Sequence, residues 1–448
     1  MGRNIRRKRL PNKRTFQSTK PYIKILIFSI FILLLVLFCL YLYEFYKNKS
    51  NYDELSKSAD NIIIDSNEIS QPTEEVKENE PITFNLTAIG DVMCHNTQYM
   101  DAYNSSTGEY DFSYVFEDIK NYIKFSDISV GSLETCFAGE DKGYSNYPTF
   151  NSPDSLAYAL SDIGIDVLST AGNHCLDMGF DGLSRTIDVL DNAKISHVGT
   201  YKSQEEQNNI LIKNVKGINI AFLNCTYGTN GISIPEDKPY CVNLIDRDLI
   251  KKHIDLAKSK DVDLIVACMH WGNEYQTTPS NEQKELSDFL FSNGVDIILG
   301  NHPHVLQPME KRTITLEDGT TKDCFVIYAS GNFICDQNAE NTRNSIILNL
   351  NITKNSDGKI SINKVTYTPI YMYKNSNLKT KKMKLLDIEK TLSNYENNTD
   401  NSIDLNTYNL LKTQLEKINS IVGGRDRGTG LKIPRLIEGT GAKIPIFI

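Results

Sequence analysis

The feature that most constrains the fold of this chain is an alternation, between residues 81 and 375, of short β-branched runs with helix-like stretches. The strand-like runs that matter most cover residues 84–89, 128–133, 167–170, 264–269 and 295–299. The helix-like stretches cover residues 114–125, 154–160, 182–192, 247–259 and 281–293. Strands that alternate with helices in this way predict a layered α/β fold.

Each of these five strand-like runs leads directly into a polar side chain that can bind a metal ion. The six side chains at these ends are Asp91, Glu134, Asn173, His270, His302 and His304. In open α/β sheets, sites are built where the carboxyl ends of the strands meet, so we expect the six side chains to converge. Taken singly, each has an ordinary structural explanation, such as a turn for Asp91, and only their shared placement predicts a site.

The types of these side chains indicate which ions they suit. Carboxylate and amide oxygens combined with imidazoles favour Mn²⁺, Fe²⁺ or Zn²⁺ and disfavour a thiolate site. Six candidates exceed the needs of one tetrahedral ion, whereas two ions about 3.5–4 Å apart would use them all. One ion with supporting polar partners is the alternative.

Pro303 shapes the loop between two of the candidate ligands. It excludes helix between His302 and His304, so we expect an extended loop that projects both imidazoles to one side.

Two of the remaining histidines are not site candidates. His253 lies in a charged helical stretch and His197 follows a polar strand start, so both are expected on the surface.

The N-terminal region predicts a membrane anchor. Residues 25–43 carry no charge, and a helix of that length rises about 28 Å, close to the hydrocarbon thickness of a bilayer. A cleaved signal peptide is the alternative, but no small-residue cleavage pattern follows the apolar run. Residues 1–24 are basic, which predicts a cytoplasmic N-terminus and an extracellular main domain in a single-pass cell-membrane protein. This position beside the span argues for anionic lipid, and against nucleic acid, as the partner of the basic residues.

Three further segments complete the expected organisation. Residues 44–80 are polar and acidic and predict a flexible linker, and residues 81–375 form the main domain. Residues 376–448 form a helical and Gly-rich tail, with helices at 383–395 and 405–422 that we expect to pack across the main domain. Eight of the nine cysteines follow the span, an even number that permits disulfides, but several lie in apolar runs typical of buried free thiols.

Six ordered motifs over about residues 83–372 resemble the CapA-type poly-γ-glutamate capsule biosynthesis family, which is similar in turn to calcineurin-like metallophosphoesterases. The motifs are Gly90-Asp91-Val92-Met93, Ser132-Leu133-Glu134, Gly172-Asn173-His174 with Asp177 and Gly179, His270-Trp271-Gly272 with Glu274, Gly300 to His304, and Ser330-Gly331-Asn332-Phe333. The resemblance implies a metallophosphoesterase-like αββα sandwich.

The resemblance also implies a role for each motif residue. One metal ion would be held by Asp91, Glu134 and His304. The other would be held by Glu134, Asn173, His270 and His302, with Glu134 as the bridge. His174 would protonate the leaving group or stabilise the transition state, and Asp177 would orient it. Glu274 and Asn332 would line the substrate pocket.

Two positions depart from the phosphoesterase pattern. Met93 stands where these enzymes usually have histidine, and a thioether does not replace imidazole for such an ion. His95, two residues further on, is a possible substitute if the loop bends. Glu134 stands where aspartate is usual, and its longer side chain would alter the geometry of a two-metal centre.

These features predict a membrane-anchored protein of the cell surface that contributes to synthesis, export or attachment of an anionic polymer such as poly-γ-glutamate. We expect a metal-dependent hydrolase-like centre acting on that polymer or on a phosphoester, and membrane subunits of a polymer synthase as partners. The alternatives are a non-catalytic scaffold of the synthase complex and a general surface phosphodiesterase.

Overall fold

The computed structural model describes residues 80–315, 319–375, 377–399, 402–423, 425–426 and 430–431. The predicted basic segment and membrane anchor, and all of the linker except Glu80, lie outside the described residues. Among the helices that are described, none combines the length and the apolar character that a bilayer crossing requires.

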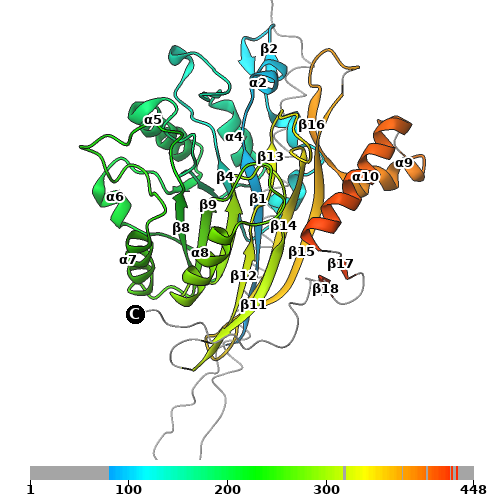
Figure 1. The fold of residues 1–448 in the computed structure, drawn as a ribbon. Coiled ribbons are helices and arrows are strands. Elements are labelled where there is room, and N and C mark those ends of the chain that lie inside the picture. Colours follow the sequence, from blue (N-terminus) through cyan, green and yellow to red (C-terminus); the bar gives the residue numbers. More distant parts are fainter. Residues whose placement is uncertain are drawn as a thin grey trace, which may run out of the picture. The chain divides into compact units, whose positions relative to one another are not determined.

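The first sheet combines parallel and antiparallel strands (Figure 1). Its spatial order is β16 (Met383–Asp387), β15 (Ile360–Lys374), β14 (Asn344–Lys354), β1 (Ile82–Val92), β4 (Ile128–Leu133), β5 (Val167–Ser169) and β6 (Ser196–Val198). Strands β1, β4, β5 and β6 are parallel, and β14 to β16 continue the sheet in antiparallel fashion. The short strand β13 (Asn332–Ile334) pairs in parallel with the end of β1.

The second sheet has a parallel centre and antiparallel edges. Its spatial order is β11 (Met309–Thr315), β12 (Thr321–Ile327), β10 (Ile297–Asn301), β9 (Leu264–His270), β8 (Ile218–Thr226) and β7 (Leu211–Val215). The four central strands are parallel, so the ends of β9 and β10 lie side by side with Asn301 opposite His270.

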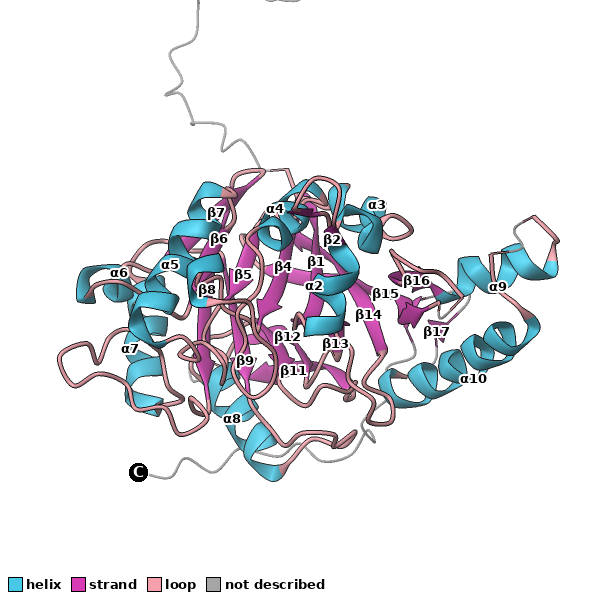
Figure 2. Cartoon of the chain, turned by 90° about the horizontal axis from the view of Figure 1, so that it is seen from above, coloured by secondary structure: helices cyan, strands magenta, loops and turns pink. Residues whose placement is uncertain are grey.

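The sheets pack face to face and helices cover their outer faces (Figure 2). Side chains alternate along each strand: Phe222 of β8 enters the core between the sheets, whereas its neighbour Ala221 faces the helices. The outer helices are α3 (Lys120–Lys124), α4 (Ser155–Asp162) and α5 (Gly179–Asn192) on the first sheet, with α7 (Arg247–Lys258) and α8 (Asn281–Ser292) on the second. The predicted α/β fold is confirmed.

Shorter elements are α2 (Asn96–Ala102), β2 (Tyr103–Asn104), β3 (Glu109–Tyr110), α6 (Gln204–Asn208), β17 (Arg425–Asp426) and β18 (Gly430–Leu431).

The C-terminal segment differs from the prediction at its start. Residues 383–395 were expected to be wholly helical, but they form strand β16 as far as Asp387 and then helix α9 (Ile388–Glu396). The strand forms because Leu385 and Leu386 alternate between the two cores while pairing with β15. Asp387 then caps α9, accepting a hydrogen bond from the Lys390 backbone N–H. Helix α10 (Leu405–Val422) packs with α9 against the core at β15 (Figure 1).

The eight described cysteines are all free thiols, and seven of them are buried. Burial raises the pKa of Cys225 and of Cys268 to about 12, so these two thiols are protonated and unreactive at neutral pH.

His253 corrects a prediction, because it is 2% exposed and not on the surface. It shares the buried face of α7 with Ile250, Ile254 and Ala257, at helical spacing, although its sequence neighbours are charged. Its Nε2 has no hydrogen-bond partner among the described residues. His197, also expected on the surface, is half-buried in β6 (Ser196–Val198).

We expect the His253→Leu variant to resist acid better than the unaltered chain. Burial, with the nearby charge of Lys252, lowers the pKa of His253 to about 4 from 6.5. As pH falls from 6.5 to 4, His253 binds a proton in the unfolded chain but not in the folded chain. The free energy of unfolding therefore decreases by up to about 3 kcal/mol. Urea unfolding at several pH values measures this slope. Equal slopes for the two proteins would contradict the prediction.

Candidate metal centre

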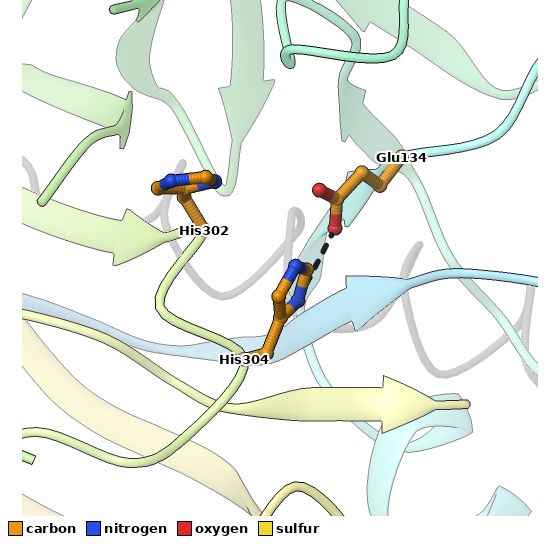
Figure 3. A group of neighbouring side chains, drawn as sticks. All are labelled: Glu134, His302 and His304. Carbon is orange, nitrogen blue, oxygen red and sulfur yellow. Dashed lines mark ion pairs between the residues drawn. The ribbon is translucent and has the colours of Figure 1, made fainter. Parts of the chain in front are cut away.

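The ends of five strands bring all six predicted ligand residues together. Asp91 lies near the end of β1, Glu134 directly follows β4, and Asn173 follows β5. His270 ends β9, and His302 and His304 follow β10. None of the six is more than 3% exposed. The closest set is Glu134, His302 and His304, whose ligand atoms all lie within 4.8 Å of one another (Figure 3).

The carboxylates of this cluster have too few hydrogen-bond donors. Both oxygens of Glu134, and Oδ1 of Asp91, have no hydrogen-bond partner among the described residues. Burial raises the pKa of Glu134 to about 8, and burial with the charge of Glu134 raises the pKa of Asp91. A buried carboxylate without donors is costly unless a cation neutralises it. Orphaned oxygens of this kind fit a divalent cation.

The imidazoles are in the form that binds metal. Burial lowers the pKa of His270 to about 3 and that of His302 to about 2, and it also lowers the pKa of His304 well below its usual value. All three rings are therefore neutral at physiological pH, with a lone pair available. Nδ1 of His270 and Nδ1 of His302 have no partner among the described residues. His304 Nδ1 lies 3.7 Å from Glu134 Oε2.

The loop around Pro303 is not extended as predicted. His302 and His304 both have positive φ angles, of 98° and 60°, a conformation that non-glycine residues rarely adopt. The two rings still face one region, with centroids 5.8 Å apart. Two contacts hold this backbone: Asp91 Oδ2 accepts a hydrogen bond from His302 N–H at 3.0 Å, and Pro303 C=O accepts one from Tyr275 N–H at 2.8 Å. Strain held in this way is typical of functional sites.

Asn332, which was predicted to line the substrate pocket, lies beside His304 and contacts its ring. It is fully buried, and its Oδ1 lies 3.1 Å from His304 Nδ1. Its Nδ2 donates to the carbonyl oxygens of His304 and Thr342 and to Gln337 Oε1. Asn332 is therefore a positioning residue.

His174 and Asp177 form a hydrogen-bonded pair beside the cluster. The distance from His174 Nδ1 to Asp177 Oδ2 is 2.8 Å, and the same oxygen accepts from Phe150 N–H at 2.6 Å. Burial acts to lower the pKa of His174, but the hydrogen bond to Asp177 and the charge of Glu134 outweigh burial and raise it. A protonated imidazole held in one orientation suits proton donation.

Several residues at the mouth of the site were not predicted. The Tyr227 ring lies 4.5 Å from that of His302, and the Tyr275 ring lies 6.1 Å from that of His304. Asn230 accepts a hydrogen bond from Asn173 Nδ2 at 3.2 Å and places its own Nδ2 3.3 Å from His174. Glu274, which was predicted, is exposed, and its charge acts on the pKa of Glu134. These residues lie on loops, where hydropathy patterns give no signal.

Met93, which departs from the phosphoesterase pattern, lies in a loop whose described residues bring no imidazole to the cluster. Met93 is 2% exposed, and its backbone N–H donates to Ile334 C=O at 3.1 Å. The possible substitute His95 is engaged elsewhere, because its Nδ1 accepts from Asp336 N–H at 3.2 Å. Its ring also packs against Phe150 at 5.4 Å. No imidazole from this described loop belongs to the Glu134 cluster.

Gly90 is needed where β1 meets β13. A Cβ at this position would lie 1.8 Å from the carbonyl oxygen of Gly331, which accepts a hydrogen bond from Asp91 N–H. We expect Gly90→Ala to lower the free energy of unfolding by about 3 kcal/mol through overpacking. Gly228→Ala is the control, since nothing lies within 4 Å of its Cβ, and it should change stability by less than about 1 kcal/mol. Equal effects in denaturant titrations would contradict the assignment.

The fold and the site define a layered α/β protein with a buried cluster suited to divalent cations. Residues 85–337, more than half of the 448 residues, match the family described as "Bacterial capsule synthesis protein PGA_cap". The chain belongs to this family, which confirms the resemblance seen in the six motifs.

Two relatives illustrate the match. The chain is 29% identical over 298 residues to "Capsule biosynthesis protein CapA" of Bacillus anthracis, covering 64% of this chain and 67% of that protein. It is 27% identical over 308 residues to "PGA biosynthesis protein CapA" of Bacillus subtilis (strain 168), covering 66% and 77%. Among solved structures, NAD nucleotidase (NadN) of Haemophilus influenzae aligns with a TM-score of 0.42 and 14% identity. The alignment covers 76% of this chain and 61% of that one.

Proposed function

We propose that this chain is a membrane-anchored extracellular protein of capsule or poly-γ-glutamate synthesis or export, with a metal-dependent, metallophosphoesterase-like hydrolase centre. The observation that carries the proposal is the buried cluster of Glu134, His302 and His304, in which both carboxylate oxygens lack donors. Such an arrangement is costly without a cation and favourable with one.

The proposed ligands form two groups that share Glu134. Asp91, Glu134 and His304 would hold one divalent ion. The second ion would be held by Glu134, Asn173, His270 and His302. When bound, Mn²⁺, Fe²⁺ or Zn²⁺ supplies Lewis acidity and lowers the pKa of water. The distances of 3.5 Å from His270 Nε2 to Glu134 Oε1, and 2.9 Å from His270 Nε2 to Asn173 Oδ1, support the second group.

His174 would act on the leaving group. Asp177 accepts a hydrogen bond from one ring nitrogen, which leaves Nε2 to carry the proton that is donated. Asn230 lies within 3.3 Å of that nitrogen and would restrict the position of the ring or of a bound oxygen. The exposed rings of Tyr227 and Tyr275 at the mouth would contact substrate groups.

The cellular part of the proposal rests on the family and on the N-terminal sequence. The relatives carry names of capsule and PGA biosynthesis, and residues 25–43 have the length and apolar character of a membrane span. Membrane subunits of a polymer synthase would be the partners, and an anionic polymer or a phosphoester would be the substrate.

The metal content of the purified full-length chain tests the catalytic proposal. We expect stoichiometric Mn, Fe or Zn by elemental analysis and Mn²⁺-dependent turnover of bis-p-nitrophenyl phosphate or of the polymer. A chain that binds no divalent ion, and whose His174→Ala variant supports normal polymer production, would refute it.

A second candidate, a non-catalytic scaffold of the synthase, is favoured by Met93, which leaves the Asp91 side of the cluster without the usual imidazole. A scaffold predicts that removing residues 1–43 abolishes polymer production while His174→Ala does not. An enzyme predicts loss of production in both.

A further inference from the structure

The sequence contains two Asn–Gly pairs, Asn230-Gly231 and Asn293-Gly294. Such a pair is chemically labile, because glycine has no side chain to hinder attack of its amide nitrogen on the side-chain amide of the preceding asparagine. The attack expels ammonia and closes a cyclic imide, which water then opens to aspartate or isoaspartate. Folding decides whether a pair reacts, since ring closure needs rotation of the asparagine backbone and an accessible glycine N–H.

Asn230-Gly231 forms the tip of an exposed turn. The two residues have φ angles of 51° and 78°, and the Ile232 N–H donates to Thr229 C=O at 2.9 Å. Two successive positive φ angles are typical of a type I′ turn, for which Asn–Gly is a preferred pair. Both residues are exposed, and no described group accepts a hydrogen bond from the Gly231 N–H. A short exposed turn can open locally, which permits the rotation that ring closure needs.

Asn293-Gly294 is protected by the fold. Asn293 caps the C-terminus of α8, and its Nδ2 donates to Phe289 C=O at 2.8 Å. The Gly294 N–H donates to Phe291 C=O at 3.0 Å, and a Cβ built on Gly294 would lie 2.6 Å from Lys258 Cε. Both reacting groups are therefore engaged, and freeing them requires opening the end of the helix. This pair is an internal control for the exposed pair.

The exposed pair also touches the proposed reaction centre. Asn230 Oδ1 accepts a hydrogen bond from Asn173 Nδ2 at 3.2 Å, and Asn230 Nδ2 lies 3.3 Å from both ring nitrogens of His174. Deamidation replaces this Nδ2 by a carboxylate oxygen. The new carboxylate would compete for the His174 ring with Asp177 Oδ2, which lies 2.8 Å from Nδ1. Isoaspartate also adds one carbon to the backbone, which displaces the turn.

We infer that Asn230 is a site of spontaneous deamidation, at which a carboxylate comes to replace the amide beside His174. The Gly231 nitrogen bonds to Asn230 Cγ while the Cγ–Nδ2 bond breaks, and the proton of the Gly231 N–H leaves with the side-chain nitrogen as ammonia. Water then adds to one carbonyl of the imide: hydrolysis at Cγ gives aspartate, and hydrolysis at the backbone carbonyl gives isoaspartate. The net change is gain of water and loss of ammonia. Only the effect on turnover rests on the proposed function.

Peptide mapping by mass spectrometry tests the modification on the full-length chain, incubated in its native state in mildly alkaline buffer. We expect the mass gain of an amide-to-acid conversion, with isoaspartate among the products, in the peptide that contains Asn230. The peptide that contains Asn293 should stay unchanged over the same time. In concentrated urea both peptides should convert at similar rates, because the fold alone protects Asn293. An Asn230 that converts only in urea, or native conversion of Asn293 as fast as that of Asn230, would overturn the inference.

The Asn230→Asp variant measures the consequence for the centre. Metal-dependent turnover should fall about tenfold, as expected when one hydrogen bond of a charged group is displaced. Asn398→Asp is the matched control, since Asn398 is also exposed with a positive φ, of 53°, and it should leave turnover unchanged. Equal turnover of Asn230→Asp and the unaltered chain would refute the effect on the centre. A chain that deamidates at Asn230 but turns over no phosphoester or polymer would refute the proposed function and confirm the modification site.

Discussion

Replacing Glu134 by glutamine should remove divalent metal from this protein and lower its metal affinity by about 100-fold or more. The side chain keeps its shape but loses the negative charge at the centre of the cluster, 3.5 Å from His270 and 3.7 Å from His304. Changes to residues that merely support metal ligands already cost about 10–100-fold, so loss of a shared anionic ligand should cost more. Elemental analysis and metal titration measure the effect.

The same variant should be more stable than the unaltered chain once metal is removed by a chelator. Burial raises the pKa of Glu134 to about 8 from 4.5. Between pH 4.5 and 8 the unfolded chain releases a proton that the folded chain retains, so stability falls as pH rises, by about 5 kcal/mol at most. Glutamine has no such titration. Added metal should reverse the order, because it stabilises only the chain that binds it.

Glu282→Gln is the matched control, since this acid is exposed in the first turn of α8. The Glu282→Gln variant should keep its metal, and after chelation its stability should fall with rising pH as that of the unaltered chain does. A Glu134→Gln protein that retains metal, or that loses stability with rising pH as the chelated unaltered chain does, would contradict the assignment of Glu134 as the central ligand.

The parallel strands were predictable because their cause is local. Runs such as 128–133 and 264–269 are uncharged, rich in apolar residues and buried throughout, as is typical of strands covered on both faces. The polar residue after each run marks its carboxyl end. Convergence of Asp91, Glu134 and His270 then follows from the architecture of open α/β sheets.

Features that depend on tertiary contacts were not predictable in this way. The left-handed conformations of His302 and His304 depend on hydrogen bonds from residues far along the chain, and the role of Asn332 behind His304 depends on a pairing across 28 residues. His253 was misjudged because its charged neighbours conceal an apolar helix face. Strand β16 was read as helix because its sheet partner, β15, decides its conformation.

His174→Asn should lower metal-dependent turnover by about 10²–10⁴-fold while leaving metal content unchanged. His174 carries the raised pKa of a proton donor, and it is not part of the Glu134 cluster. Steady-state kinetics on bis-p-nitrophenyl phosphate or on the polymer, with elemental analysis of the same samples, measures both quantities. Equal loss of metal and activity would make His174 a ligand.

The Asp177→Asn variant tests whether His174 is the proton donor. The variant keeps an oxygen for Phe150 N–H but loses the charge and the strong hydrogen bond that raise the pKa of His174. An acid catalyst must be protonated, so activity falls as pH rises through its pKa. A lower pKa moves that fall to lower pH. Asp181 is exposed in the first turn of α5, so Asp181→Asn should leave the dependence of activity on pH unchanged. If Asp177→Asn also leaves this dependence unchanged, His174 is not the acid. If polymer production survives both His174→Asn and Asp177→Asn, the chain acts through binding and assembly and not through catalysis. Met93, in place of the usual histidine, would then explain the lack of catalysis.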